Sequence, residues 1–165
     1  MAQKTRSINL RESINAPKNK VFSMLVKSDE LVRWFPTTAE ADPVVGGHYA
    51  FTFEFLDPAT KSHKHFGKFV DVKAGERVEY TWNADTNAVI SDTKVAFILS
   101  ENNGKTDIQL EHTGWNDTDE ATKRIEDHTK GWTFFLQNLK SVLEQGQDSR
   151  SSLMGMKDGV QTAVA

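Results

Sequence analysis

The chain has 165 residues, a formal net charge of −3 and no cysteine. This length suits a single domain, and the lack of cysteine excludes disulfides, thiolate metal sites and thiol nucleophiles. The weakly acidic charge argues against a nucleic-acid-binding surface, which is usually basic. No apolar run approaches the roughly 20 residues that span a bilayer, and the N-terminal stretch lacks the apolar core of a signal peptide. We therefore expect no membrane span and a cytoplasmic location.

The N-terminal part of the sequence predicts one strand and two short helices. Residues 4–15 alternate between apolar and polar side chains, as in a half-buried strand, although Glu12 falls on the apolar face. Pro17 suits the first position of a short helix. Ser28 and Asp29 resemble the cap of a second short helix, which ends at Pro36.

Five further strands are predicted in the middle of the chain. The alternating runs cover residues 48–55, 63–72, 77–82, 93–100 and 106–113. The connections LDPATKS, KAGE and ENNGK contain the residue types of tight reversals, so these strands are expected to form an antiparallel meander. With the first strand they make a six-stranded sheet, and the stretch with PVVGG is expected to be a loop.

A long helix is predicted over residues 118–145, about 42 Å at 1.5 Å per residue. Asp117 and Glu120 resemble a capping box, and Gly146 supplies a stop. A helix of this length with one apolar stripe needs a long concave partner, which a curved antiparallel sheet provides. The expected fold is therefore α+β, with the helix lying along the sheet and the short helices at its open end.

Two features of this C-terminal region need separate interpretation. Gly131 interrupts the helix beside Trp132 at a cost of roughly 1 kcal/mol relative to alanine. We expect it to let the helix backbone approach the sheet or the short helices, or to relieve crowding at a packed crossing. Residues 147–165 have no usable period, so they are interpreted as a mobile tail outside a domain of residues 1–146.

Several segments together resemble a known family. They are INAP at 14–17, ELVRWF at 30–35, GGHYAF at 46–51, GKFVDV and ERVEYTW within 67–82, TDIQLEHTGW at 106–115 and GWTFFLQNLKSVLEQG at 131–146. In this order they resemble the activator-of-Hsp90-ATPase-like (AHSA1-like) branch of the START/Bet v 1-like (SRPBCC) superfamily. The resemblance implies a helix-grip fold with an internal cavity, and relatives that bind lipids, sterols, polyketides or flavonoid-like molecules. Gly131 and Trp132 match a recurrent pair of that family, which marks the fold.

A set of large aromatic residues is the first candidate site. Their rings could line a cavity for a flat apolar compound, with tyrosine and tryptophan polar atoms orienting it. The alternative is a close-packed core. The set comprises Trp34, Phe51, Phe53, Phe66, Phe69, Tyr80, Trp82, Phe97, Trp132 and Phe135.

Polar residues on apolar strand faces are the second candidate. Glu12 and His112 must find partners or shift their pKa if buried, so they could orient a ligand or transfer protons. A satisfied structural role is the alternative. His63 and His65 project from one strand face, but a metal site needs three or four ligands, so no metal is expected. No motif for a cofactor is present.

Three functional hypotheses follow from these residues and the resemblance. The leading one is binding of a small hydrophobic, ring-containing molecule in an internal cavity. The second is a protein-interaction module that acts on a chaperone, as the name of the branch suggests. The third is an enzyme that uses Glu12, His112 or Tyr80 for proton transfer. The sequence leaves monomer and homodimer open.

Overall fold

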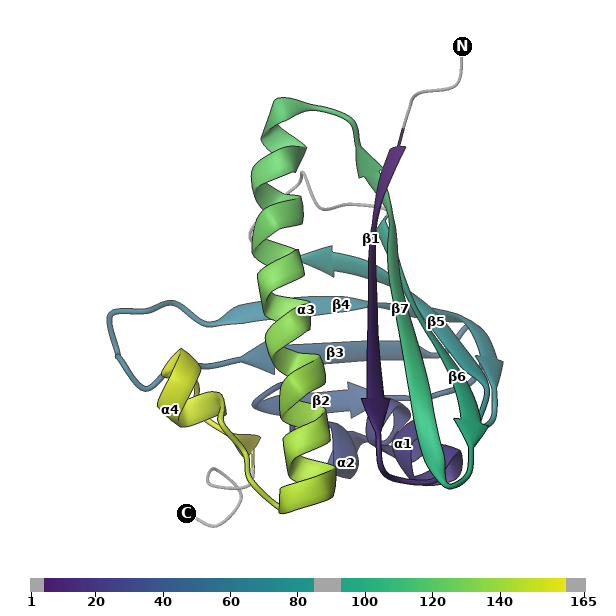
Figure 1. Ribbon diagram of the computed structural model, residues 1–165. Helices are drawn as coiled ribbons and strands as arrows, with labels where there is room; N and C mark the ends of the chain where they lie inside the picture. Colours follow the sequence, from purple (N-terminus) through teal and green to yellow (C-terminus); the bar gives the residue numbers. More distant parts are fainter. Residues whose placement is uncertain (1–4, 85–92, 160–165) are drawn as a thin grey trace.

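The computed structural model describes residues 5–84 and 93–159. It is an α+β fold in which one antiparallel sheet curves around a long helix, α3 (Figure 1). The elements in chain order are β1 (Thr5–Ile14), α1 (Lys18–Val26), α2 (Ser28–Leu31), β2 (Thr38–Ala41), β3 (His48–Phe53), β4 (His63–Lys73), β5 (Arg77–Ala84), β6 (Thr93–Asn102), β7 (Lys105–Asn116), α3 (Asp119–Gln145) and α4 (Arg150–Met154). The predicted fold class is confirmed.

The sheet of the described residues has seven strands in the order β1-β7-β6-β5-β4-β3-β2, so the predicted count of six is wrong. The additional strand, β2, pairs with β3 from Thr38 opposite Thr52 to Ala41 opposite Tyr49. It lies in a region interpreted as a loop, because its four residues, TAEA, carry no large apolar side chain that would reveal a strand. The meander from β3 to β7 is confirmed.

The hairpin between β6 and β7 fixes how β7 faces the core. Asn103 and Gly104 both have positive φ, 54° and 79°, as the two-residue turns that match strand twist require. Asn102 therefore pairs with Lys105, and the register runs on to Val95 opposite His112. This register points His112 into the protein, where it is fully buried.

Helix α3 crosses in front of β2, β3 and β4 (Figure 1) and buries one face against the sheet. Thr118 is its N-cap, with the side chain accepting a hydrogen bond from the Ala121 amide, so the predicted capping box at Asp117 is wrong. Gly146 ends the helix in the left-handed conformation, as predicted. The apolar residues buried by α3 are Ala121, Trp132, Phe135, Leu136, Leu139 and Val142.

The short helices and the turn after them hold the first large rings of the core. Trp34 is 1% exposed, and its indole N–H donates to the Met24 carbonyl at 2.7 Å. Phe35 stacks on Trp34 with ring centroids 5.0 Å apart. A buried indole N–H usually needs such a partner, and this bond fixes the position of the next residue, Phe35.

The segment after α3 packs onto the domain over its described residues, 147–159. Arg150 is fully buried, and Met156 is 1% exposed. A β-bridge joins Met156 to Phe55, just beyond the end of β3. The expected mobility of residues 147–165 stays a prediction, and residues 160–165 lie outside the described residues. Within residues 5–84 and 93–159, no helix is long and apolar enough to cross a bilayer.

Candidate functional site

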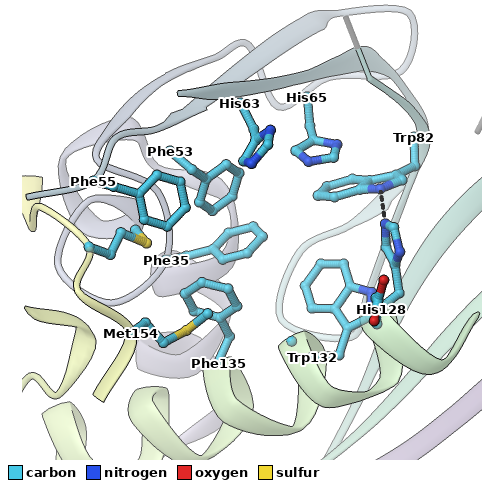
Figure 2. A pocket seen from close by; sticks show the side chains of 13 residues that line it. Phe35, Phe53, Phe55, His63, His65, Trp82, His128, Trp132, Phe135 and Met154 are labelled. Atoms are coloured by element: carbon cyan, nitrogen blue, oxygen red, sulfur yellow. Dashed lines mark hydrogen bonds between the residues drawn. The ribbon is translucent and has the colours of Figure 1, made fainter. Parts of the chain in front are cut away.

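A pocket of about 310 Å³ lies between α3 and the strands β3, β4 and β5, and it opens to solvent (Figure 2). Its volume falls at the lower end of the ~300–1,000 Å³ typical of small-molecule sites. Its lining residues are Phe35, Phe53, Phe55, His63, His65, Trp82, Asp127, His128, Gly131, Trp132, Phe135, Met154 and Met156. The wall is therefore mainly aromatic.

Phe35 is the centre of this aromatic wall (Figure 2). Its ring centroid lies 4.9 Å from Phe135, 5.2 Å from Phe53 and 5.2 Å from Trp132. The contacts with the two phenylalanines are edge-to-face, a geometry that the ring quadrupoles favour. Phe35 follows α2, Phe53 ends β3, and the other two rings belong to α3. The fold thus brings together rings from three separate parts of the chain.

Gly131 forms the part of the α3 wall where no side chain fills the space. Apart from its chain neighbours and the backbone of its own helix, a Cβ atom built on Gly131 would meet no atom of the described residues within 4 Å. Both expectations for this glycine, close approach of the helix to another element and relief of crowding at a packed crossing, are therefore wrong. Its missing side chain leaves room in the pocket, and the helix loses roughly 1 kcal/mol relative to alanine for it.

His128 and Trp82 form the polar end of the pocket. The indole N–H of Trp82 donates to His128 Nε2 at 3.3 Å, as Figure 2 shows, and His128 Nδ1 lies 2.9 Å from the Arg124 carbonyl. Because an indole N–H can only donate, Nε2 is the acceptor and Nδ1 carries the proton. Burial lowers the pKa of His128, against the opposing effects of the Arg124 carbonyl and Asp127. His128 is therefore neutral at pH 7.

His112 lies next to Trp132 in a linear chain of buried hydrogen bonds. The Trp132 indole N–H donates to His112 Nδ1 at 3.1 Å, so His112 Nε2 carries the proton and donates to Thr93 Oγ1 at 2.9 Å. The Thr93 hydroxyl donates onward to the Trp82 carbonyl at 3.1 Å. Burial, followed by the neighbouring His128 and His65, lowers the pKa of His112 well below its ordinary value. Both ring nitrogens are engaged, so His112 orients Trp132.

The predicted aromatic set divides between the pocket and the core. Phe53, Trp82, Trp132 and Phe135 line the pocket, whereas the other buried members pack behind them. Those core members are Trp34, Phe51, Phe69, Tyr80 and Phe97. Burial raises the pKa of Tyr80 far above its ordinary value, so this hydroxyl stays protonated. Four members of the aromatic set therefore line a pocket and five belong to the core, and ligand binding by the first group stays a prediction.

Two predicted site residues, Phe66 and Glu12, belong neither to the pocket lining nor to the buried core. Phe66 is 40% exposed on β4 and faces away from the buried Phe69. Glu12 accepts a hydrogen bond from the Ser13 amide and lies 3.9 Å from Lys140 Nζ. In the register of β1 and β7, His112 pairs with Ile8, four residues before Glu12. At ~3.3 Å per residue the two groups do not converge, and Tyr80 lies on another strand.

Several lining residues were missed or undervalued in the sequence. His63 and His65 share one strand face, as their alternation predicted, and both line the pocket. His128 could have been found as a polar residue on the apolar stripe of α3. Met154 and Met156 carried no periodic signal. Within the described ranges 5–84 and 93–159, no three histidine, aspartate or glutamate side chains gather as metal ligands.

Comparisons with known proteins place this architecture among solved structures. Protein CV1439 from Chromobacterium violaceum shares 24% identity and a TM-score of 0.72, over 84% of this chain and 96% of that one. The Aha1 protein from Colwellia psychrerythraea, solved as a dimer in solution, shares 23% identity and a TM-score of 0.68, over 86% and 98%. CalU16 from Micromonospora echinospora shares 22% identity and a TM-score of 0.68, over 87% and 78%.

These likenesses show the fold, and a family match goes further. No curated protein matches the sequence. The family described as activator of Hsp90 ATPase homolog 1-like protein matches residues 15–144, which include both short helices, β2 to β7 and nearly all of α3. The chain therefore belongs to this family.

Proposed function

We propose that this protein binds an uncharged, ring-containing hydrophobic small molecule in the pocket between α3 and the sheet. The observation that carries the proposal is an aromatic-walled space of about 310 Å³ into which Gly131 projects no side chain. This space corresponds to roughly ten water molecules at ~30 Å³ each. Water makes few hydrogen bonds to such walls, so its displacement by an apolar ligand is favourable.

The chemistry of the wall supports an aromatic or polycyclic ligand. Trp82 and Trp132 lie with ring centroids 5.3 Å apart, and His65 stacks on Trp82 at 4.3 Å. These flat rings can make stacked or edge-to-face contacts with a flat ligand. Each such contact stabilises the complex by about 0.5–1.5 kcal/mol beyond the burial of apolar surface. The thioethers of Met154 and Met156 add adaptable contacts that favour aromatic groups.

The electrostatics of the pocket support an uncharged ligand. Among the described residues of the lining, Asp127 is the one carboxylate, and it is exposed and lies 3.1 Å from Lys123 Nζ. His128 is neutral and already engaged with Trp82 and Arg124. A buried ligand charge would therefore lose its hydration without gaining a counter-ion, which costs several kcal/mol.

Binding can be tested with N-phenyl-1-naphthylamine, an uncharged dye whose fluorescence rises in apolar surroundings. We expect saturable binding to the wild type and a loss of at least about tenfold in affinity, or ~1.4 kcal/mol, for Gly131→Leu. The Cβ position at Gly131 is open towards the pocket, so a leucine side chain there would take up pocket volume. Lys130→Leu is the matched control, because Lys130 is the adjacent, exposed residue of the same helix. No saturable binding, or equal affinities for all three proteins, would refute the proposal.

A protein-interaction role is the second candidate, and membership of the Hsp90-activator-like family favours it. Apolar side chains on the outer face of β4, Phe66 and Val70, are 40% and 36% exposed and offer a contact surface. Pull-down of the host's Hsp90-type ATPase, with the Phe66→Ser variant beside the wild type, tests this role. Light scattering on the same samples distinguishes a monomer from the homodimer described for the Colwellia relative.

A further inference from the structure

The C-terminal segment, residues 147–158, forms one wall of the pocket. Met154 and Met156 both line it (Figure 2 labels Met154). Met156 is 1% exposed and Met154 is 37% exposed, so one thioether belongs to the interior and the other lies towards solvent. The family match ends at residue 144. Among the described residues that line the pocket, these two methionines alone lie outside the part of the chain that the family model covers.

Backbone hydrogen bonds attach this segment to the end of β3. The Leu56 amide donates to the Gly155 carbonyl, and the Lys157 amide donates to the Glu54 carbonyl, both at 2.8 Å. Met156 lies between them and bridges to Phe55. The backbone that carries both methionines is thus held in a defined register against β3 and the residues just after it, which supply Phe53 and Phe55.

A buried polar network holds the start of the segment. Arg150, fully buried, donates to the carbonyls of Val32 at 2.7 Å and Pro36 at 2.8 Å, and to Asp148 Oδ2 at 2.7 Å. Asn138 of α3 links to the same group, because its side chain contacts Asp148 Oδ1 at 3.1 Å and accepts from the Ser149 amide at 2.8 Å.

This network reaches the aromatic wall as well. Asn138 Nδ2 donates to the Trp34 carbonyl at 2.9 Å, and Arg150 contacts the carbonyls on both sides of the Phe35–Pro36 bond. The turn that presents Phe35 and the segment that presents Met154 and Met156 therefore share one set of buried hydrogen bonds. Buried charges of this kind hold a unique geometry, because each loses much if its partner moves.

We propose that Met154 and Met156 are specificity-determining residues of the pocket, set in place by the Asn138–Asp148–Arg150 network. This proposal rests on the ligand-binding function proposed above. The residues of the family match supply a pocket open on one side, and the C-terminal segment of this chain sets its size. Because methionine is unbranched and polarisable, these side chains adapt to a ring-containing ligand.

The test compares two uncharged probes that differ by one phenyl ring, N-phenyl-1-naphthylamine and 1-naphthylamine. The measured quantity in each variant is the affinity for N-phenyl-1-naphthylamine divided by the affinity for 1-naphthylamine. Met154→Trp narrows the pocket and so disfavours the larger probe, and this ratio should fall by at least about tenfold. Met156→Ala widens the interior end, so the ratio should change in the opposite direction. Leu153→Trp is the control, because Leu153 is 73% exposed in the same short helix and does not line the pocket.

The outcomes separate this proposal from the proposed function. If Gly131→Leu abolishes binding of both probes while the ratio stays constant in Met154→Trp and Met156→Ala, the pocket binds ligands but its C-terminal wall does not select them. That result overturns the present proposal alone. If Gly131→Leu leaves both affinities unchanged, the binding function fails and the specificity proposal fails with it. Circular dichroism spectra that match the wild type establish that each variant is folded.

Discussion

At the scale of single residues, Gly131 shows how helix stability and open space compete at one position. The residue lies in the interior of a 27-residue helix, where glycine is unfavourable, and a Cβ there would touch no other element of the described structure. The packing of α3 against the described residues therefore does not require glycine. The loss of stability is compensated only if the open space itself is used.

We expect Gly131→Ala to raise the free energy of unfolding by about 0.5–1 kcal/mol, since alanine favours the helix and meets no neighbour. Urea denaturation measures this change. Gly67→Ala is the contrasting variant, because its Cβ would clash with the hydroxyl and carbonyl oxygens of Thr81, so the substitution should destabilise the protein. If Gly131→Ala destabilises the protein instead, the helix is packed more tightly at this point than the structure indicates.

His112 provides a second prediction at this scale, on the pH dependence of stability. Its pKa is lowered in the folded protein, so below about pH 6.5 the unfolded chain binds a proton that the folded chain does not. The contribution of neutral His112 to the free energy of unfolding is therefore fully present above that pH. On acidification it falls by up to about 1.4 kcal/mol per pH unit. His112→Gln should show a shallower loss between pH 7 and 5 in urea denaturation.

The control for this prediction is His48→Gln, at an exposed position at the start of β3. It should keep the wild-type pH dependence. Equal slopes for His112→Gln and the wild type would mean that His112 is not held neutral by the bonds to Trp132 and Thr93. His112→Gln should also be less stable than the wild type at pH 7 by about 1–3 kcal/mol, because the Trp132 N–H loses a well-placed acceptor.

At the scale of elements, the sequence predicted the helices and strands in which apolar side chains recur at a regular spacing. It did not predict the elements that are held by backbone hydrogen bonds or by ionic contacts. Helix α3 and strands β3 to β7 each carry several large apolar residues at the right spacing. Strand β2 is four residues at a sheet edge, and α4 is five residues held by Arg150. An arginine in a polar stretch is usually a surface residue, so its burial could not be foreseen.

The Arg150–Asp148 pair gives a prediction at this scale. Burial alone would raise the pKa of Asp148, but the hydrogen bonds and charge of Arg150, with the hydrogen bond from Asn138, together lower it. Its contribution to stability is therefore present at neutral pH and is lost in acid as the pH falls through this lowered pKa. Asp148→Asn leaves a fully buried guanidinium without its counter-ion, and should cost about 3 kcal/mol in the free energy of unfolding at pH 7.

Urea denaturation at pH 7 and in mild acid measures both parts of this prediction. The matched comparison is Lys123→Ala, which removes an ion pair whose partners are 74% and 54% exposed and should cost less than about 1 kcal/mol. Equal effects of the two variants would mean that the C-terminal segment is not anchored by Arg150 in solution.

At the scale of the whole molecule, the pocket arises because the apolar face of α3 and the apolar face of the sheet are not in contact along their whole length. Trp82 and Phe135 have the same sequence signature as Phe97 and Leu139, yet the first pair lines a pocket and the second pair is buried in close contact. Periodicity tells which face of an element is apolar, and it carries no information on where two such faces separate. The site also combines residues from 35 to 156, and Met154 and Met156 lie outside every periodic segment.

A ligand in this pocket would stabilise the whole fold, because its walls come from α3, the sheet and the C-terminal segment together. At a dye concentration ten times its Kd, binding to the native state alone contributes about 1.4 kcal/mol. For a chain of this length, that corresponds to a rise in Tm of roughly 3–6 °C. Calorimetry with N-phenyl-1-naphthylamine should show this shift for the wild type and for Lys130→Leu, and no shift for Gly131→Leu. If the shift persists in Gly131→Leu, the dye binds another surface, such as the outer face of β4 with Phe66 and Val70. That outcome would favour the protein-interaction role, because this face offers exposed apolar side chains.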